Sequence, residues 1–519
     1  MPSNNKLASR KLALLLVASI ASTIPVAAQA AAPVLIDGAE FGLRDDLAWL
    51  ADRGRIGLGL TTWPQPLGVI EKALDRVRAD ELEEADRDAL ARARSALQRL
   101  RGGAAVGAKL NTARHPSAGG DGVARGRAEG YAQIAGTGLS TDPAEAEGAS
   151  TAWRLRARAS EGRLARDPSP LGLDGSYLAW GGDAAVLSLG ALDRWWGGGR
   201  TTGTLLTDAA APVPTLSLRR GNEDAPSWPW LAWIGPWSYE LSIGRMTHYQ
   251  PRGTNLIGMR LVARPIEGLE IGAGRMIYWG GSGRSRSAGS LADAVLGRSN
   301  IDDPALQGDD PSNEVAGVDL RYTHAFRGFS LGGHMQLAGE DEAGYFPSKQ
   351  FATVGLQLKH ASERWRFDWS LEGTDTRLSS LFGLDRQRGL SAYQHFSYTQ
   401  GHYHQGLPVG AAVGGGGTQA TLMLGLVPVA APDERRYELR LWQAEVSRNG
   451  FEPINAAYGV PGTIHGALVQ ASGEWRATSQ RLRWNLGVSV QDRGGDGGVE
   501  PGRRRAGLVG SIELPLGGR

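Results

Sequence analysis

An alternation of apolar and polar residues with a period of two is the feature that most constrains this chain. In the segment "WRLRARA", the apolar residues Trp153, Leu155 and Ala157 alternate with Arg154, Arg156 and Arg158. Successive side chains of a β-strand point to opposite faces, so the segment has one apolar and one basic face. Two folds produce this pattern: a soluble antiparallel sheet on a core, and a membrane barrel with a polar lumen.

Segments of about ten residues with the same alternation recur from about Gly103 to the C-terminus, separated by glycine and charge clusters. At roughly 20 to 25 residues per strand and connection, this part of the chain accommodates about 16 to 20 strands. A single open sheet of that size would expose its edges, whereas a closed barrel has none. We therefore predict an all-β transmembrane barrel of antiparallel strands.

In such a barrel, an arginine that faces lipid costs roughly 2 to 4 kcal/mol near the midplane of the bilayer. We therefore expect Arg154, Arg156 and Arg158 to face the lumen, with acidic partners. A basic lumen fits both a plugged barrel and a pore that prefers anions.

Residues 40 to 101 follow a different pattern. Leu43, Leu47 and Leu50 have helical spacing, and Gly54 is a plausible helix end. From about 67 to 101, leucines recur among dense arginine, aspartate and glutamate. We expect two or three short amphipathic helices in a small, solvated module.

The N-terminus has the three parts of a secretory signal. Basic residues precede the apolar run from Leu12 to Ile20, and "AQA" ends at Ala30, which predicts a signal peptide over residues 1–30. Beyond it, no apolar run reaches the roughly 18 residues that a transmembrane helix needs.

Composition and motifs argue against several kinds of chemistry. The chain has no cysteine, and its formal net charge is +2 from 56 basic and 54 acidic residues, so neither thiolate chemistry nor nucleic-acid binding is indicated. No nucleophile elbow, H-E-x-x-H motif or phosphate-binding loop is present. His402 and His404 share a strand face, and Asp302/Asp303 and Asp309/Asp310 are carboxylate pairs, but solvated loops are the simpler interpretation. We predict a protein that is not an enzyme and that has no cofactor and no metal site.

The tryptophans cluster where prolines interrupt the strand pattern. Trp228, Trp230, Trp233 and Trp237 lie among Pro226, Pro229 and Pro236, which places them at a rim of the barrel. A membrane-interface girdle is the favoured interpretation, and a platform for sugar rings is the alternative. The segment "RWWGGG" (194–199) is interpreted as girdle and turn in the same way.

Three connections are too long for hairpins: 284–313, 374–410 and 447–464. Long loops on a rigid barrel are where function is expected. In "AYQHFSYTQGHYHQ" (392–405), rings occur together with amides and imidazoles that hydrogen-bond hydroxyl groups. We take this as a candidate exposed polysaccharide-binding surface, the alternative being a loop folded into the barrel mouth; its candidate residues are Tyr393, His395, Tyr398, Tyr403 and His404.

The segment "YWGGSGRSRS" (278–287) is a second candidate. Strand alternation ends at Trp279, and glycines allow the chain to turn sharply before Arg284 and Arg286. These residues are predicted to line or plug the lumen by pairing with acidic loop residues such as Asp293. Direct contact with an acidic polysaccharide is the alternative.

Several motifs, taken together and in order, resemble the capsule assembly Wzi family. They are "LRDDLAWLADRGRI", "TTWPQP" (61–66), "WLAWIGPWSYELSIGRM" (230–246), "RPIEGLEIGAGRMIYWGGSGRSRS" (264–287) and "NEVAGVDLRYTH" (313–324). The resemblance extends from about Phe41 to the C-terminal strands. The long loops show no match that identifies a glycan.

The resemblance implies a barrel of about 18 strands whose extracellular loops occlude the lumen, and a lectin-like role in attaching capsular polysaccharide. Together with the predicted signal peptide and the change of period near Gly103, it divides the chain into a signal peptide (1–30), a periplasmic helical module (31–102) and an outer-membrane barrel (103–519). The expected partners are capsular or exopolysaccharide, outer-membrane lipid and periplasmic or outer-membrane export components, but no nucleic acid. The alternative function is an outer-membrane diffusion porin for anions or sugars.

Overall fold

The computed structural model describes residues 33–37, 41–78, 80, 82–112, 128–139, 141, 150–161, 170–297, 312–340, 342–343, 346–347, 349–380, 385–431, 434–446, 462–477, 480–493 and 503–516. The predicted signal peptide and the carboxylate pairs at 302–303 and 309–310 lie outside these ranges. In the described parts of the chain, none of the helices is long and apolar enough to span a membrane.

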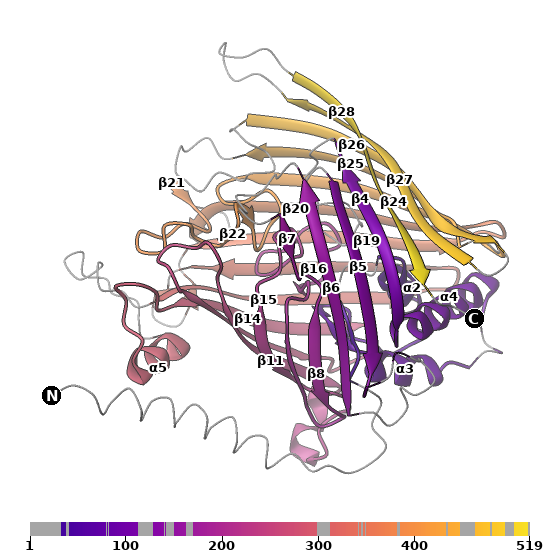
Figure 1. Ribbon diagram of the computed structural model, residues 1–519, viewed down its shortest axis with the longest axis horizontal. Helices are drawn as coiled ribbons and strands as arrows, with labels where there is room; N and C mark the ends of the chain where they lie inside the picture. The colour runs from indigo at the N-terminus through magenta and orange to yellow at the C-terminus, as the bar shows by residue number, and fades with distance from the viewer. Residues whose placement is uncertain are drawn as a thin grey trace.

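Eighteen antiparallel strands form one closed barrel, which confirms the predicted fold class and strand number (Figure 1). The barrel closes where β28 pairs with β4, with Val509 opposite Asn111. Two short strands, β7 (Leu171–Gly172) and β21 (Asp385–Ser391), pair beside β6 and β20. The barrel strands are β4 (Gly103–Asn111), β5 (Ala128–Thr137), β6 (Thr151–Glu161), β8 (Tyr177–Gly181), β9 (Val186–Gly190), β11 (Thr215–Arg219), β12 (Trp237–Arg245), β13 (Asn255–Ala263), β14 (Leu269–Trp279), β15 (Ser312–Ala325), β16 (Phe329–Gly339), β19 (Gln350–Ala361), β20 (Trp365–Ser380), β24 (Thr418–Pro428), β25 (Arg436–Val446), β26 (Gly462–Ala477), β27 (Gln480–Arg493) and β28 (Arg503–Leu516).

The strand alternation separates an apolar outer wall from a polar lumen. On β6, Leu155 is 53% exposed, whereas its neighbour Arg154 is buried. The same alternation exposes Leu241, Leu261 and Val318 on other strands. Exposed aliphatic side chains beside buried charged ones reverse the arrangement of a soluble protein and are typical of a transmembrane barrel.

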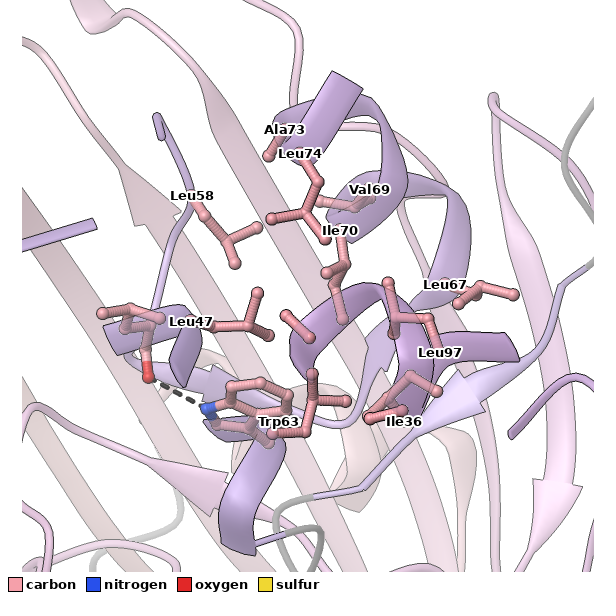
Figure 2. Close-up of a cluster of buried hydrophobic side chains, with 14 of the residues drawn as sticks. Ile36, Leu47, Leu58, Trp63, Leu67, Val69, Ile70, Ala73, Leu74 and Leu97 are labelled. Carbon is pink, nitrogen blue, oxygen red and sulfur yellow. Dashed lines mark hydrogen bonds between the residues drawn. The ribbon is translucent and has the colours of Figure 1, made fainter. Parts of the chain in front are cut away.

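Three helices lie at one end of the barrel: α2 (Phe41–Asp52), α3 (Leu67–Asp75) and α4 (Glu84–Leu100). They share an apolar core that includes Leu47, Trp63, Ile70 and Leu97 (Figure 2). The sequence pattern predicted these helices. The solvated character predicted for the module is wrong in part, because the core also contains the barrel residue Ala179.

We call the end with the helices the helical end, and the opposite end the loop end. In Figure 1, α2 and α4 lie on the right, whereas β21, β22 (Tyr403–His404) and helix α5 (Ala288–Leu296) lie on the left. Most turns at the helical end are short, such as 326–328 and 362–364. The three long connections singled out in the sequence join strands at the loop end, whereas residues 138–150 and 220–236 are longer connections at the helical end.

Candidate functional site in the lumen and at the loop end

The module is fixed in the barrel by buried ion pairs with the lumen wall. Asp46 of α2 accepts hydrogen bonds from Arg92 of α4, Arg366 of β20 and Arg436 of β25. Asp52, at the end of the same helix, forms ion pairs with Arg321 and Lys359. These pairs explain how a charged helix is buried, since each carboxylate is neutralised by cations from the wall.

The ionisation of these two carboxylates depends on the wall. Burial alone would raise the pKa of Asp46, but the charges of Arg436, Arg92 and Arg366 together lower it below its ordinary value. Burial acts on Asp52 in the same way, and Arg321 and Lys359 bring its pKa down to about 2. Both carboxylates are therefore charged at neutral pH.

The three arginines of β6 lie on the lumen side of the wall. Arg154 forms an ion pair with Asp37 of the module, and Arg158 forms one with Asp174 at 2.9 Å. The Nε of Arg156 donates to the Oε1 of Gln133 at 2.7 Å. The wall on this side thus binds the N-terminal segment directly.

A cavity of about 170 Å³ remains between the module and this part of the wall. Its lining carries charges of both signs, from Asp37, Arg92, Lys109, Arg156, Glu474 and Arg483. The space is therefore polar, as expected for the lumen of an outer-membrane barrel.

The connection between β9 and β11 crosses the lumen. Its strand β10 (Trp195–Trp196) pairs with β2 (Thr62–Trp63) of the N-terminal segment, and the side chains of Trp195 and Trp196 are fully buried. Further along, the backbone N–H of Thr207 donates to the carbonyl of Val409 at 2.8 Å. The interpretation of "RWWGGG" as a membrane girdle is therefore wrong, because these rings pack inside the barrel.

The aromatic segment predicted as an exposed sugar-binding surface is mostly buried in the structure. Tyr393, Tyr398, Tyr403 and His404 are each at most 3% exposed. The hydroxyl of Tyr393 donates to the carbonyl of Thr204 at 2.6 Å, and that of Tyr398 to the carbonyl of Gly280 at 3.1 Å. The predicted exposure of these four residues is wrong, because their rings fill the barrel mouth and bond to neighbouring loops.

His402 lies at the centre of this packing. Its Nδ1 is 2.9 Å from the hydroxyl of Tyr278, and its Nε2 is 2.7 Å from the carbonyl oxygen of Leu205. Burial lowers the pKa of His402 to about 4, although the hydrogen bond with Leu205 opposes this effect. His402 is therefore neutral at physiological pH.

The nitrogens of His404 are also engaged, by Thr247 and Ala211. The described residues contain no group of three or more histidine, aspartate or glutamate side chains arranged to hold a metal ion.

A smaller part of the segment does face outward at the loop end. Phe396 is 52% exposed, and its ring stacks on the partly exposed ring of His395 with 4.4 Å between centroids. Partly or fully exposed amide and hydroxyl side chains occur near this pair in the same segment, and we call the set the loop-face patch: Gln394, His395, Phe396, Thr399, Gln400 and Gln405. Gln405 connects the patch to the β12–β13 turn by donating to Thr247 Oγ1 at 3.4 Å.

The candidate residues chosen from the sequence include only His395 among the residues of this patch. In a strand, the alternation of residue types shows which side chains point to each face. Residues 392–402 do not form a strand, so their sequence does not show which side chains point outward.

The predicted plug residues Trp279, Arg284 and Arg286 do not lie together in the lumen. Trp279 ends β14 on its outward face and donates from Nε1 to Ser290 Oγ of α5 at 3.2 Å. Arg286 is exposed beside Gly253 at the rim, and Arg284 is partly exposed in the same loop. The plugging prediction is therefore wrong for Trp279 and Arg286, because the chain turns outward after Gly280 and Gly281, both of which have positive φ.

The four tryptophans predicted as a girdle lie at the helical end. Trp228, Trp230 and Trp233 are 61%, 68% and 72% exposed around the 3-10 helix η3 (Pro229–Ile234). Trp237 is the first residue of β12 and is half-buried. The guanidinium carbon of Arg220 lies over its ring, 4.3 Å from the ring centroid.

These features define a class of protein: a transmembrane β-barrel of eighteen strands whose lumen contains a helical module and inward-folded loops. The chain belongs to the capsule assembly protein Wzi family, whose model matches residues 121–491.

Two relatives agree with this assignment. A Klebsiella pneumoniae protein described as an uncharacterized 55.8 kDa protein in the cps region is 30% identical over 442 residues, or 83% of this chain and 81% of the relative. The solved structure of Escherichia coli Wzi is 26% identical, with a TM-score of 0.78, and the match covers 93% of this chain and 99% of that one. That protein is described as an outer-membrane, carbohydrate-binding β-barrel involved in group 1 capsule assembly.

Proposed function

We propose that this protein binds capsular or related exopolysaccharide at its loop face and so helps to attach or organise the polymer at the cell surface. Family membership and the carbohydrate binding of the E. coli relative support this function. The observation that carries it for this chain is the loop-face patch, which combines an exposed stacked ring pair with several amides above a filled lumen. Rings stack on sugar faces, and amides bond hydroxyl groups in both directions.

The lengths of the loops support one direction of the barrel in the membrane. Outer-membrane barrels have short turns on the periplasmic side and long loops outside. The loop end would thus face the medium, and the helical module, residues 31–102, the periplasm. In this orientation the exposed tryptophans at the helical end lie at the periplasmic interface, where amphipathic rings are favoured. This location also leaves the module accessible to export components.

The buried, ion-paired carboxylates of the lumen support a role in binding without catalysis. Buried carboxylates such as Asp46 and Asp52 are neutralised by two or three cations each. A glycosidase needs one carboxylic acid and one carboxylate beside an open cleft. The ion-paired carboxylates instead hold the module in place.

The alternative function, a diffusion porin for anions or sugars, requires an open water path through the barrel. The module, the β9–β11 connection and residues 392–414 all lie within the lumen and contact one another. This filling supports a closed barrel.

The proposed function is tested by measuring how tightly the purified full-length barrel binds immobilised capsular polysaccharide. The polysaccharide is purified from the same strain that produces this protein. The double variant His395→Ala/Phe396→Ala removes the exposed ring pair. Loss of two stacking contacts is expected to weaken binding about ten-fold.

A matched control exists at the helical end. His324 and Phe326 form another exposed His–Phe pair, with ring centroids 4.6 Å apart. The variant His324→Ala/Phe326→Ala should bind like the wild type. Equal weakening in both double variants, or no binding by a folded wild type, would contradict the proposal.

A further inference from the structure

Helix α5 packs on the outside of the barrel wall. Ile257 of β13 and Ile277 of β14 belong to the outward-facing set of residues, because their neighbours Met276 and Tyr278 point into the lumen. Lipid-facing residues such as Leu241 and Leu261 on the neighbouring strands are exposed, but Ile257 and Ile277 are 9% and 0% exposed, since Ala294 of α5 covers them.

The ends of α5 are well defined. Ser287 caps the N-terminus by accepting a hydrogen bond from the N–H of Ser290 at 3.0 Å, and Gly297 ends the helix in the left-handed conformation. Trp279 ties the helix to the wall through Ser290, as described above. The free side of α5 carries Ala288, Ala292 and the 58% exposed Leu296, together with the exposed Asp293. A short helix whose free side is apolar except for Asp293 thus lies on the wall near its rim.

Two arginines converge beside this helix. Arg245 is the last residue of β12 and faces outward, like the exposed Leu241 and Ile243 on the same strand. The two guanidinium groups lie beside Gly253. A Cβ atom added to this glycine would clash with Nη2 of Arg245 and would lie 3.0 Å from Nη2 of Arg286. Both guanidinium groups therefore lie against the same point of the backbone.

Among the described residues, no carboxylate lies within 4.0 Å of a side-chain nitrogen of Arg245, Arg286 or the exposed Arg252, which precedes Gly253. The arrangement is held by neighbouring backbone, since the carbonyl of Arg252 accepts from the N–H of Ser282 at 2.8 Å and Gly253 accepts from Arg286. Like charges so close together repel each other unless an anion lies between them.

The position of the cluster in the wall indicates which anion it meets. Arg245 is directly opposite Asn255 in the sheet, and Asn255 is opposite Trp279, so these three form the last outward-facing row at the rim. Towards the middle of the barrel the outward residues are apolar and exposed, as with Leu261 and Ile271. The outward-facing ion pair of Arg275 and Glu314 lies between them and the rim row, so the row itself is on the headgroup side of the boundary with the acyl chains.

We propose that Arg245, Arg286 and Arg252, together with the free side of α5, bind the phosphorylated headgroup of a glycolipid in the outer leaflet. Guanidinium groups bind phosphate oxygens in a bidentate fashion, and Ala292 and Leu296 would contact the acyl chains. The outward direction of Arg245 favours a lipid over a soluble polysaccharide, because this residue projects from the lipid-facing side of β12 and not from the loop-face patch.

The test measures binding of the detergent-solubilised, full-length barrel to three probes by native mass spectrometry or by thermal shift. The probes are bis-phosphorylated lipid A, the same lipid without phosphates, and soluble polygalacturonate as an acidic polymer. We expect the wild type to bind the phosphorylated lipid at least about ten-fold more tightly than the dephosphorylated lipid. The variant Arg245→Ala/Arg286→Ala should lose this preference.

The control variant is Arg327→Ala/Arg364→Ala, which removes two exposed arginines from turns at the helical end. It should retain the wild-type preference, and heat-modifiable migration on a gel verifies that each variant is folded. The proposal is overturned if Arg245→Ala/Arg286→Ala keeps the preference, if both lipids bind equally, or if only polygalacturonate binds. None of these outcomes depends on whether the loop-face patch binds polysaccharide.

Discussion

Asp46 in helix α2 and Arg366 in strand β20 form an ion pair between residues 320 positions apart, with 2.5 Å between Asp46 Oδ1 and Arg366 Nη1. Arg436 and Arg92 bind the same carboxylate. A single buried side chain thus connects two barrel strands and two helices of the module.

The variant Asp46→Asn should therefore release the module from the wall. Removing the negative charge leaves three guanidinium groups without their shared counter-ion, a change expected to cost about 3 to 5 kcal/mol. Trypsin cleavage within residues 41–100 measures the release. As a control, Asp224→Asn removes an ion pair whose side chains are 44% and 48% exposed, and it should cost less than about 1 kcal/mol. Equal trypsin resistance of Asp46→Asn and the wild type would contradict the role of this carboxylate.

His402 should make the docking of residues 392–414 sensitive to acid. Its pKa is about 4 in the folded loop and 6.5 in an undocked one, so the undocked state binds more protons between these values. Docking is then most stable above pH 6.5 and weakens as the pH falls towards 4. Between pH 7.5 and 5.5 the protection of backbone amides in this loop against hydrogen exchange should fall about ten-fold, after correction for intrinsic rates. The same fall in His402→Gln would show that another group is responsible.

The wild-type barrel should show no steady conductance in a planar bilayer. Replacing residues 198–212 by a short glycine linker removes Leu205 and the bond between Thr207 and Val409, and should produce an open or flickering pore. Removing residues 229–234, none of which is buried, should leave the barrel closed. A steady pore in the wild type would instead favour the diffusion porin.

Gly401 should not tolerate a side chain. Its φ is +56°, and a Cβ atom there would overlap the carbonyl oxygen of Tyr393. Gly401→Ala should thus cost more than the roughly 1 kcal/mol of backbone strain alone and increase protease cleavage of residues 392–414. Gly283→Ala is the matched control, because Gly283 also has positive φ, +78°, but has open space around it. Similar cleavage in both variants would show that the overlap is relieved at little cost.

The strand alternation and the number of strands together predicted the barrel, because period-two patterns separate the two faces of each strand and only a closed sheet of that size has no exposed edges. It could not predict the fate of the aromatic clusters. Trp195 and Trp230 occur in similar Trp- and Gly/Pro-rich segments, yet Trp195 is fully buried and Trp230 is 68% exposed. The difference depends on β2, which lies more than 130 residues before Trp195 in the chain and pairs with it. Pairing with a segment so distant in the chain cannot be recognised from the residues around Trp195.

For the proposed function, a filled lumen has a consequence for the direction from which the polysaccharide arrives. If the module, the β9–β11 connection and residues 392–414 together close the barrel, a polysaccharide chain at the loop face has reached it from the medium, after export by other components. The loop face would then bind polymer from its own cell and polymer shed by a neighbouring cell in the same way, because both arrive from the medium. A population could in this way share one coat, so that cells unable to synthesise the polymer but carrying this barrel would still be covered by it.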